Sequence, residues 1–257
     1  MTDTPPTPGT PPTPPIPPSL GAPPTSDRRT SRTTPSLSRG VFITFEGGDG
    51  VGKTTHLRLL AARLEANGLK VVRLREPGGT AVGEQVRSIL LNPENTDLSP
   101  VAELLLYESA RAQLVLQVII PALAEGAVVL CDRYTDSTVA YQGFGRGLGL
   151  SLVEQANRIA TQGVAAHRTV LLVDQVDAAL ARAREQGADR MEAAGLDFHR
   201  RVSEGFLQLA ADDPERIRII HLDEDRRVTA ERVLAAVADL FDQPLSADFD
   251  IDSELSD

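Results

Sequence analysis

Five short apolar runs, each four to six residues long and rich in valine and isoleucine, recur along the middle of the chain. Segments with the apolar spacing of helices separate them. Strands that are apolar at every position are typical of a parallel sheet covered on both faces, and their alternation with helices predicts a doubly wound α/β fold. The expected strands are Val41–Phe45, Val71–Leu74, Val128–Cys131, Val170–Val173 and Ile217–Leu222, and the expected helices are Thr55–Ala66, Val101–Leu123, Leu152–Thr161, Leu196–Ala211 and Ala230–Leu240.

Both ends of the chain differ in composition from this middle part. Residues 1–40 hold 12 of the 18 prolines, among Thr, Ser and Gly, and we expect a disordered, partly polyproline tail there. Residues 242–257 carry six acids and no base, which is typical of an acidic disordered tail. Residues 41–241 then form a single domain of ordinary size.

Composition excludes several classes of protein. The net charge is −10, and nonspecific binding of nucleic acid needs a basic face, so we expect no nucleic-acid partner. The single cysteine, Cys131, excludes an intramolecular disulfide and a zinc site built from several thiolates. No apolar run of about 18 residues and no signal-peptide region occurs, so we expect no membrane association and a cytoplasmic location.

A glycine-rich phosphate loop follows the first expected strand. It matches the pattern G-x-x-x-x-G-K-S/T between a strand and a helix. Glycines let such a loop turn its backbone N–H groups toward phosphate oxygens at the positive end of a helix dipole. We expect Lys53 to neutralise β- and γ-phosphate charge and the Thr54 hydroxyl to coordinate Mg²⁺. The expected nucleotide-binding residues are Gly47, Gly48, Asp49, Gly50, Val51, Gly52, Lys53, Thr54 and Thr55.

The loop alone is compatible with a switch GTPase, a motor ATPase or a kinase. Lysine occurs only at positions 53 and 70, so the Asn-Lys-x-Asp motif of guanine-specific GTPases is absent. Asp132 ends the third expected strand, where a buried carboxylate needs a cation; Mg²⁺ bound through water is one interpretation and an arginine pair is the other. Arginines gathered near the strand ends suggest a second anionic substrate.

Four segments together resemble bacterial thymidylate kinases: Glu46–Thr55, Arg75–Thr80, Ser109–Gln113 and Cys131–Gly143. The resemblance extends from about residue 41 to 241. It implies a P-loop NTPase-type five-stranded parallel sheet with a helical lid, and transfer of the γ-phosphoryl group of ATP to dTMP, giving dTDP and ADP for dTTP synthesis. It also implies Mg²⁺ and a homodimer, with the helix Val101–Leu123 at the interface. Because the acceptor phosphate is already an anion, arginines that align two polyanions matter more than a general base.

The resemblance assigns roles on the phosphate and sugar side of the acceptor. Asp49 is expected to contact the sugar 3′-hydroxyl and to order water near Mg²⁺. Arg133 is expected to bind the acceptor phosphate, and Tyr141 to crowd C2′ and so favour deoxyribose. Further acceptor-side residues implied by the resemblance are Arg75, Glu76 and Arg87.

On the base side, Tyr107 stands where the family usually has Phe and is expected to stack on thymine. Arg111 lies one helical turn on and is expected to donate to a thymine carbonyl. Thr138 and Gln142 match positions that read the pyrimidine edge. Departures from the family pattern are His167-Arg168-Thr169, where Asp-Leu-Thr is frequent, and Leu114, where His is frequent.

The cation over the transferring phosphoryl group is expected from a lid. Some thymidylate kinases carry an arginine in the phosphate loop after the acid, but this chain has Gly50 there. The segment Ala178–Glu192 resembles the lid of the other members, and a lid that closes on binding excludes water. Its candidates are Arg182, Arg184 and Arg190, and the sequence leaves open which one reaches the γ-phosphate.

Two other functions remain open at this point. The thymine methyl pocket is not readable from sequence, so another pyrimidine acceptor such as dUMP is an alternative. A nucleotide-gated module that recruits partners through the Pro-rich tail is a second alternative, from a different class.

Overall fold

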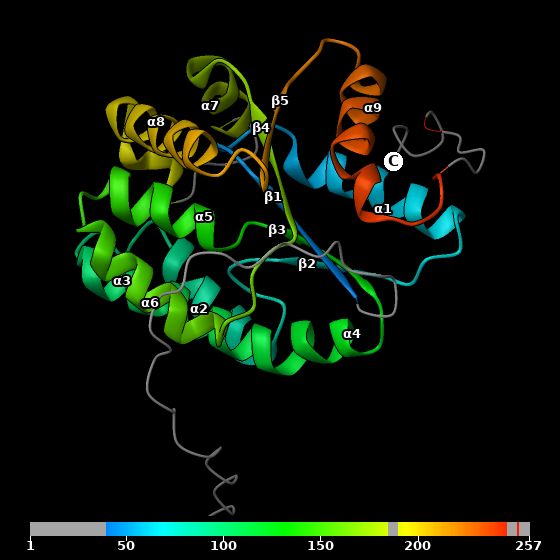
Figure 1. Cartoon of the computed structure of the whole chain (residues 1–257). Coiled ribbons are helices and arrows are strands. Elements are labelled where there is room, and N and C mark those ends of the chain that lie inside the picture. The colour runs from blue at the N-terminus through cyan, green and yellow to red at the C-terminus, as the bar shows by residue number, and fades with distance from the viewer. Residues whose placement is uncertain (1–39, 185–189, 246–250, 252–257) are drawn as a thin grey trace, which may run out of the picture. The chain divides into compact units, whose positions relative to one another are not determined.

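The computed structural model describes residues 40–184, 190–245 and 251. Five strands form a parallel sheet in the order β2-β3-β1-β4-β5 (Figure 1). The strands are β1 (Val41–Glu46), β2 (Val71–Arg75), β3 (Val128–Asp132), β4 (Arg168–Val173) and β5 (Ile217–His221). The predicted parallel α/β sheet is therefore confirmed, with strand ends that differ from expectation by one or two residues.

The strand order places the carboxyl ends of β1, β2 and β3 together. Parallel pairing sets Phe45 and Arg75 opposite the same residue, Asp132. The residues that follow these strands therefore meet at one edge of the sheet. In open α/β sheets this carboxyl edge is where ligands bind.

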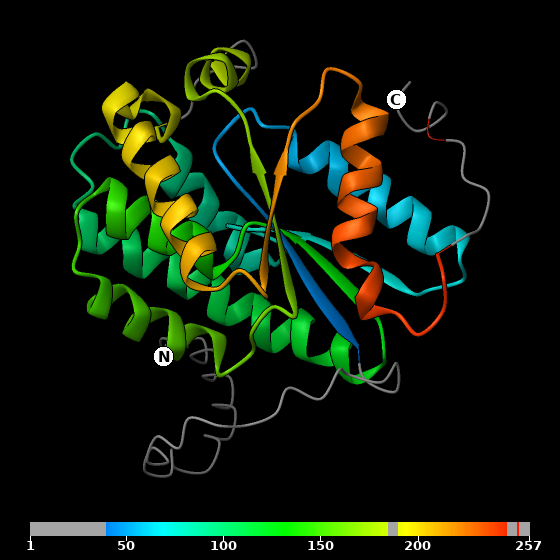
Figure 2. The ribbon, with the colours of Figure 1, turned by 45° about the horizontal axis from the view of Figure 1, so that its top comes forward.

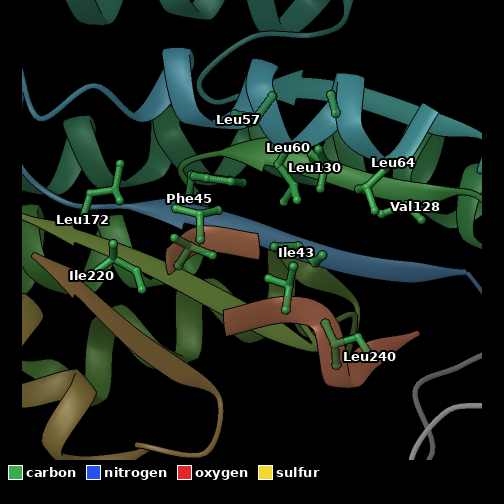
Figure 3. Close-up of a cluster of buried hydrophobic side chains, with 14 of the residues drawn as sticks. Ile43, Phe45, Leu57, Leu60, Leu64, Val128, Leu130, Leu172, Ile220 and Leu240 are labelled. Atoms are coloured by element: carbon green, nitrogen blue, oxygen red, sulfur yellow. The ribbon is translucent and has the colours of Figure 1, made fainter. Parts of the chain in front are cut away.

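Helices cover both faces of the sheet (Figures 1 and 2). On one face, α1 (Lys53–Ala66) packs with α9 (Arg226–Val237) against strand residues such as Ile43 and Phe45 (Figure 3). Phe42 lies in a separate cluster on the opposite face, since successive strand side chains alternate. That side carries α2 (Ala81–Leu91), α3 (Pro100–Leu114), α6 (Leu150–Thr161) and α8 (Leu196–Asp212). The remaining α-helices are α4 (Ile120–Ala124), α5 (Thr135–Thr138) and α7 (Val176–Arg184). The π segments are η1 (Val115–Ile119) and η2 (Val139–Gly145), and the 3₁₀ segments are η3 (Glu192–Ala194) and η4 (Ala238–Leu240).

The expected single helix Val101–Leu123 is continuous but changes register in its middle. The π segment η1 separates α3 from α4, and Pro121 stands at the start of α4. Proline has no N–H to donate to the carbonyl four residues back, so the helix accommodates it by shifting its hydrogen bonds. None of the described helices is long and apolar enough to cross a bilayer.

Four helical segments lie outside the expected helices: α2, α5, η2 and the short η3. Helix α2 starts after Thr80, whose hydroxyl accepts a hydrogen bond from the Gly83 amide at 2.9 Å. Because this N-cap directly follows a glycine-rich turn, the sequence pattern there indicates a turn and not the start of a helix. The segments α5 and η2 are built from residues with strand or turn preference, and tertiary packing decides their helical state.

Candidate active site

The phosphate loop connects β1 to α1, and positive φ angles shape it. The angles are 130° at Gly47, 74° at Gly50 and 79° at Gly52. A Cβ atom on Gly47 would lie 2.3 Å from the Leu172 carbonyl oxygen, so no other residue fits there. The loop therefore depends on glycine both for its turn and for its close approach to β4.

Lys53 lies across the loop, where its Nζ donates to the carbonyls of Gly47 at 3.2 Å and Gly48 at 2.6 Å. The side chain is buried. Burial, together with the charge of Arg133, lowers the pKa of Lys53 to about 8. A desolvated cation at the start of a helix is well placed to receive phosphate oxygens in place of these carbonyls.

The carboxyl ends of β1 and β3 bring two oxygen ligands together. The Thr54 hydroxyl donates to Asp132 Oδ2 at 2.7 Å. Mg²⁺ prefers such hard oxygen donors. Groups of three or more His, Cys, Asp or Glu able to hold a metal are absent from the described part of the chain. A Mg²⁺ ion here would consequently need phosphate and water oxygens to complete its shell, which suits an ion that arrives with a nucleotide.

Arg133, Asp49 and Tyr141 form a closed hydrogen-bonded set. The Arg133 guanidinium donates to Asp49 Oδ1, to Tyr141 Oη at 3.1 Å and to the Gly47 carbonyl at 3.1 Å. Tyr141 in turn donates to Asp49 Oδ2 at 2.8 Å. Burial opposes ionisation of Asp49, but the charges of Arg133 and Lys53 hold its pKa below the ordinary value. The set presents a fixed cation and carboxylate beside the phosphate loop.

The backbone at Arg133 is strained, because its φ is +72° without being glycine. Glu46, for which the sequence analysis predicts no role, stabilises this turn. Its buried carboxyl accepts from the Tyr134 amide at 2.8 Å and from the Ser137 hydroxyl at 2.5 Å. Burial and the nearby Asp136 raise the pKa of Glu46 to about 8. The sequence signal for Glu46 is a carboxylate at the last position of an otherwise mostly apolar strand.

Arg111 is the most buried arginine of the site, with 1% of its surface exposed. It pairs with Glu76 at 2.6 Å and Glu108 at 2.7 Å, and donates to Thr138 at 2.8 Å and Asn157 at 2.7 Å. Burial raises the pKa of Glu76 to about 7, although the Arg111 charge opposes the shift. The expected donation from Arg111 to a base stays a prediction, and Glu108 and Asn157 are partners that sequence reasoning missed.

The outer acceptor-side residues are more open. Arg75 pairs with Glu84 at 3.0 Å and is about half exposed. Arg87 donates to the Pro77 carbonyl at 2.9 Å. By contrast, Gln142 on the base side is buried and donates to Glu103 at 2.8 Å.

Most of the predicted residues line one cleft of about 960 Å³, whereas Gly47 and Gly48 line a separate pocket. The volume of the cleft is at the upper end of ordinary small-molecule sites, enough for more than one substrate. His56, Leu222, Asp223 and Arg226 extend the lining beyond the predicted residues. The predicted residues that line it are Asp49, Gly50, Val51, Gly52, Lys53, Thr54, Thr55, Arg75, Glu76, Arg87, Tyr107, Arg111, Asp132, Arg133, Thr138, Tyr141, Gln142 and Arg182.

Comparison with known proteins identifies the family. The family model described as thymidylate kinase matches residues 45–232. The chain belongs to the thymidylate kinase family. A thymidylate kinase of Pelotomaculum thermopropionicum is 49% identical over 206 residues, which cover 79% of this chain and 95% of that protein. One of Citrifermentans bemidjiense is 51% identical over 205 residues, covering 77% and 91%. The crystal structure of the Ehrlichia chaffeensis thymidylate kinase matches with a TM-score of 0.63 at 32% identity, covering 77% of this chain and 98% of that one.

The three arginines expected in the lid of this chain lie in different surroundings. Arg182, on α7, donates to the Gly50 carbonyl at 3.2 Å and pairs with Asp174. Arg184 ends α7, and its side chain lies outside the described part of the structure, as do residues 185–189 of the expected lid. Arg190 is largely buried, 2.7 Å from Glu103 and 2.7 Å from the Leu90 carbonyl. In this conformation only Arg182 of the described pair contacts the phosphate loop.

Proposed function

We propose that this chain transfers the γ-phosphoryl group of ATP to the 5′-phosphate of dTMP, giving dTDP and ADP. Membership of the thymidylate kinase family supports a phosphotransferase, and the geometry supports the two-anion reaction. The observation that carries the proposal is that the phosphate loop and the Arg133–Asp49–Tyr141 set line the same cleft. A nucleotide switch needs the loop but has no use for a second cationic site beside it.

The chemistry follows from positioning and charge. The loop N–H groups and Lys53 bind the donor phosphates, exchanging the carbonyls of Gly47 and Gly48 for phosphate oxygens. Arg133 can bind the acceptor phosphate while Asp49 and Tyr141 hold its guanidinium in place. The acceptor oxygen is already anionic, so the site needs alignment rather than a base.

Arg182 is the lid residue best placed to supply the remaining cation. Its contact with the Gly50 carbonyl puts the guanidinium beside the loop position that carries arginine in some relatives. Arg190 pairs with the buried carboxylate of Glu103 instead. We therefore assign the γ-phosphate contact to Arg182, with the expected lid Ala178–Glu192 as its carrier.

Thr54 and Asp132 would hold Mg²⁺, Thr54 directly and Asp132 through water. When bound, the metal neutralises phosphate charge and orients the donor for in-line transfer. The Thr54–Asp132 hydrogen bond keeps both oxygens at the loop before the nucleotide arrives.

A homodimer is part of the proposal. Helices α2, α3 and α6, which pack on the same face of the sheet, expose the large apolar side chains Val82, Ile89, Val101, Leu105 and Ile159. We propose that these side chains contribute to the dimer interface, since contiguous exposed apolar surface is typical of one. The cytoplasmic location, the 41–241 domain boundaries and a partner for the Pro-rich tail stay predictions, and the tail lies outside the described residues.

The test is ADP release by the full-length chain with MgATP and dTMP, dUMP, dCMP, dGMP or no acceptor. We expect turnover with dTMP well above the rest. Equal ADP release without acceptor would contradict the proposal and indicate an ATPase or a switch, whereas dUMP turnover matching dTMP would indicate a broader pyrimidine kinase. Arg133→Met should lower kcat/KM for dTMP at least about a hundredfold. Arg218→Met, at the exposed edge strand β5, serves as the matched control and should leave turnover unchanged.

A further inference from the structure

A buried carboxylate outside the predicted site joins the cleft to the end of the lid. Glu103, on α3, has no exposed surface. Its Oε1 accepts from Gln142 Nε2 at 2.8 Å and from Arg146 Nε at 3.1 Å. Its Oε2 lies 3.0 Å from Arg146 and 2.7 Å from Arg190. Three side chains therefore converge on one carboxylate: Gln142 from η2, Arg146 from the C-cap of η2, and Arg190 from the end of the expected lid.

The surroundings of Glu103 keep it ionised. Burial alone would favour the neutral acid, but hydrogen bonds from Arg146, Gln142 and Arg190 together with the Arg146 charge lower its pKa. An ionised carboxylate accepts hydrogen bonds and cannot donate one. Gln142 must consequently turn its NH₂ group toward Glu103.

That orientation decides what Gln142 offers to a ligand. With Nε2 committed to Glu103, the carbonyl oxygen is left on the other side of the amide, and no described residue donates to it. Gln142 lines the cleft. With the NH₂ group held at Glu103, the carbonyl oxygen is the group by which Gln142 can accept a hydrogen bond from a ligand in the cleft.

Pyrimidine bases differ in whether the ring atom N3 is a hydrogen-bond donor or an acceptor. Thymine and uracil carry an N–H donor at N3, whereas N3 of cytosine is an acceptor. A fixed carbonyl oxygen can accept a hydrogen bond from the N3–H of thymine or uracil. Opposite cytosine, the same oxygen faces the N3 lone pair and no hydrogen bond forms. We propose that Glu103 is a positioning residue that fixes Gln142 as a hydrogen-bond acceptor and so selects acceptor nucleotides with an N3–H. This inference rests on the proposed function of the cleft.

The rest of the cluster holds this arrangement rigid. Arg190 also donates to the Leu90 carbonyl at the end of α2, at 2.7 Å. The Arg146 guanidinium lies 4.6 Å from the centre of the Phe198 ring on α8. Glu103 is thus fixed from four elements, so its hydrogen bond to Gln142 is pre-organised before any ligand binds.

The experiment compares kcat/KM for dTMP and dCMP in the full-length chain carrying Glu103→Gln, Gln142→Ala or both. A glutamine at position 103 can donate as well as accept, so Gln142 is free to turn over. We expect the dTMP-to-dCMP ratio to fall about tenfold in E103Q, chiefly through a higher KM for dTMP with kcat little changed. In the Q142A background, E103Q should not lower the ratio further, because its effect acts through Gln142.

Controls separate this role from a merely structural one. Asp239→Asn removes the carboxylate that pairs with the buried Arg168, on β4, and should leave the ratio unchanged. If E103Q does not fold, Glu103→Asp keeps the charge but withdraws the oxygen from Gln142, and the same fall is expected. A folded E103Q with an unchanged ratio, or an equal fall in the Q142A background, would overturn the inference. Wild type lacking dTMP-dependent turnover would refute the proposed function instead.

Discussion

Replacing Lys53 with methionine should stabilise the nucleotide-free protein while abolishing most of its activity. The pKa of Lys53 falls from an ordinary 10.5 to about 8, chiefly through burial. Each pH unit corresponds to about 1.4 kcal/mol, so keeping this side chain charged at pH 7 costs about 3 kcal/mol. Methionine avoids that cost but loses two hydrogen bonds to loop carbonyls, each worth about 1 kcal/mol. The net expectation for Lys53→Met is a gain of about 1 to 2 kcal/mol.

The stability difference between Lys53→Met and wild type should depend on pH. The folded pKa lies below the unfolded one, so the unfolded state binds the proton more tightly. The penalty is complete below about pH 8 and disappears as the pH rises to 10.5. The stability difference between Lys53→Met and wild type should shrink over that interval, as measured by urea unfolding at pH 7 and pH 10. MgATP should reverse the order at pH 7, because phosphate binding stabilises the charged lysine.

The chain offers a matched control, because its other lysine is Lys70. Lys70 is 61% exposed and pairs with Glu125 at the surface. Lys70→Met should change the free energy of unfolding by less than about 0.5 kcal/mol and leave turnover intact. Lys53→Met should lower kcat at least about a hundredfold. A Lys53→Met protein less stable than wild type without nucleotide, at unchanged m value, would refute the reasoning.

Three further predictions concern stability and the acceptor site. Burial and the charge of Arg226 lower the pKa of His56 to about 4, so the free energy of unfolding should fall as the pH falls from 6.5 to 4. His56→Gln should remove up to about 3 kcal/mol of this fall, as measured by urea unfolding at several pH values. An unchanged dependence on pH in this range would contradict the prediction. Arg111→Met leaves Glu76 and Glu108 buried without their cation and should lower the free energy of unfolding by about 3 to 5 kcal/mol; a loss below about 1 kcal/mol by urea unfolding would show that these carboxyls do not depend on it. Tyr141→Phe removes the hydroxyl between Arg133 and Asp49 but keeps the ring. The kcat/KM for dTMP should fall about tenfold, while the preference for dTMP over the thymine ribonucleoside monophosphate is kept. Steady-state kinetics with both acceptors would contradict this if that preference fell and kcat/KM for dTMP did not.

The strands and the phosphate loop were predictable because their information is local. A run such as Val41–Phe45 is apolar at every position, and the structure buries β1 on both faces. The loop pattern fixes its glycines and lysine within eight consecutive residues, and its context of strand and helix is confirmed. The order of the strands was not readable, because it depends on which strand pairs with which across the sheet.

Local preference misled where tertiary packing decides the outcome. Helix α2 contains Gly83 and follows a Pro-Gly-Gly turn, so the propensity of its sequence is weak. The amide of Gly83 nevertheless bonds to Thr80, and a Cβ at position 83 would lie 2.7 Å from the Gly78 carbonyl. The glycine is needed for close packing, which sequence preference counts only as a cost.

The sequence by itself predicted the parallel α/β sheet and the phosphate loop, and its resemblance to a family indicated many, but not all, of the side chains that line the cleft. It could not determine which of the many arginines are available to a ligand. Every arginine in a sequence is an equivalent cation, but a buried one must find a carboxylate from another segment. Only the tertiary structure paired Arg111 with Glu76 and Arg190 with Glu103, while bringing Arg182 to the loop. Those pairings form across tens of residues, and the cost of burying an unpaired charge is the physical reason that the fold had to decide them.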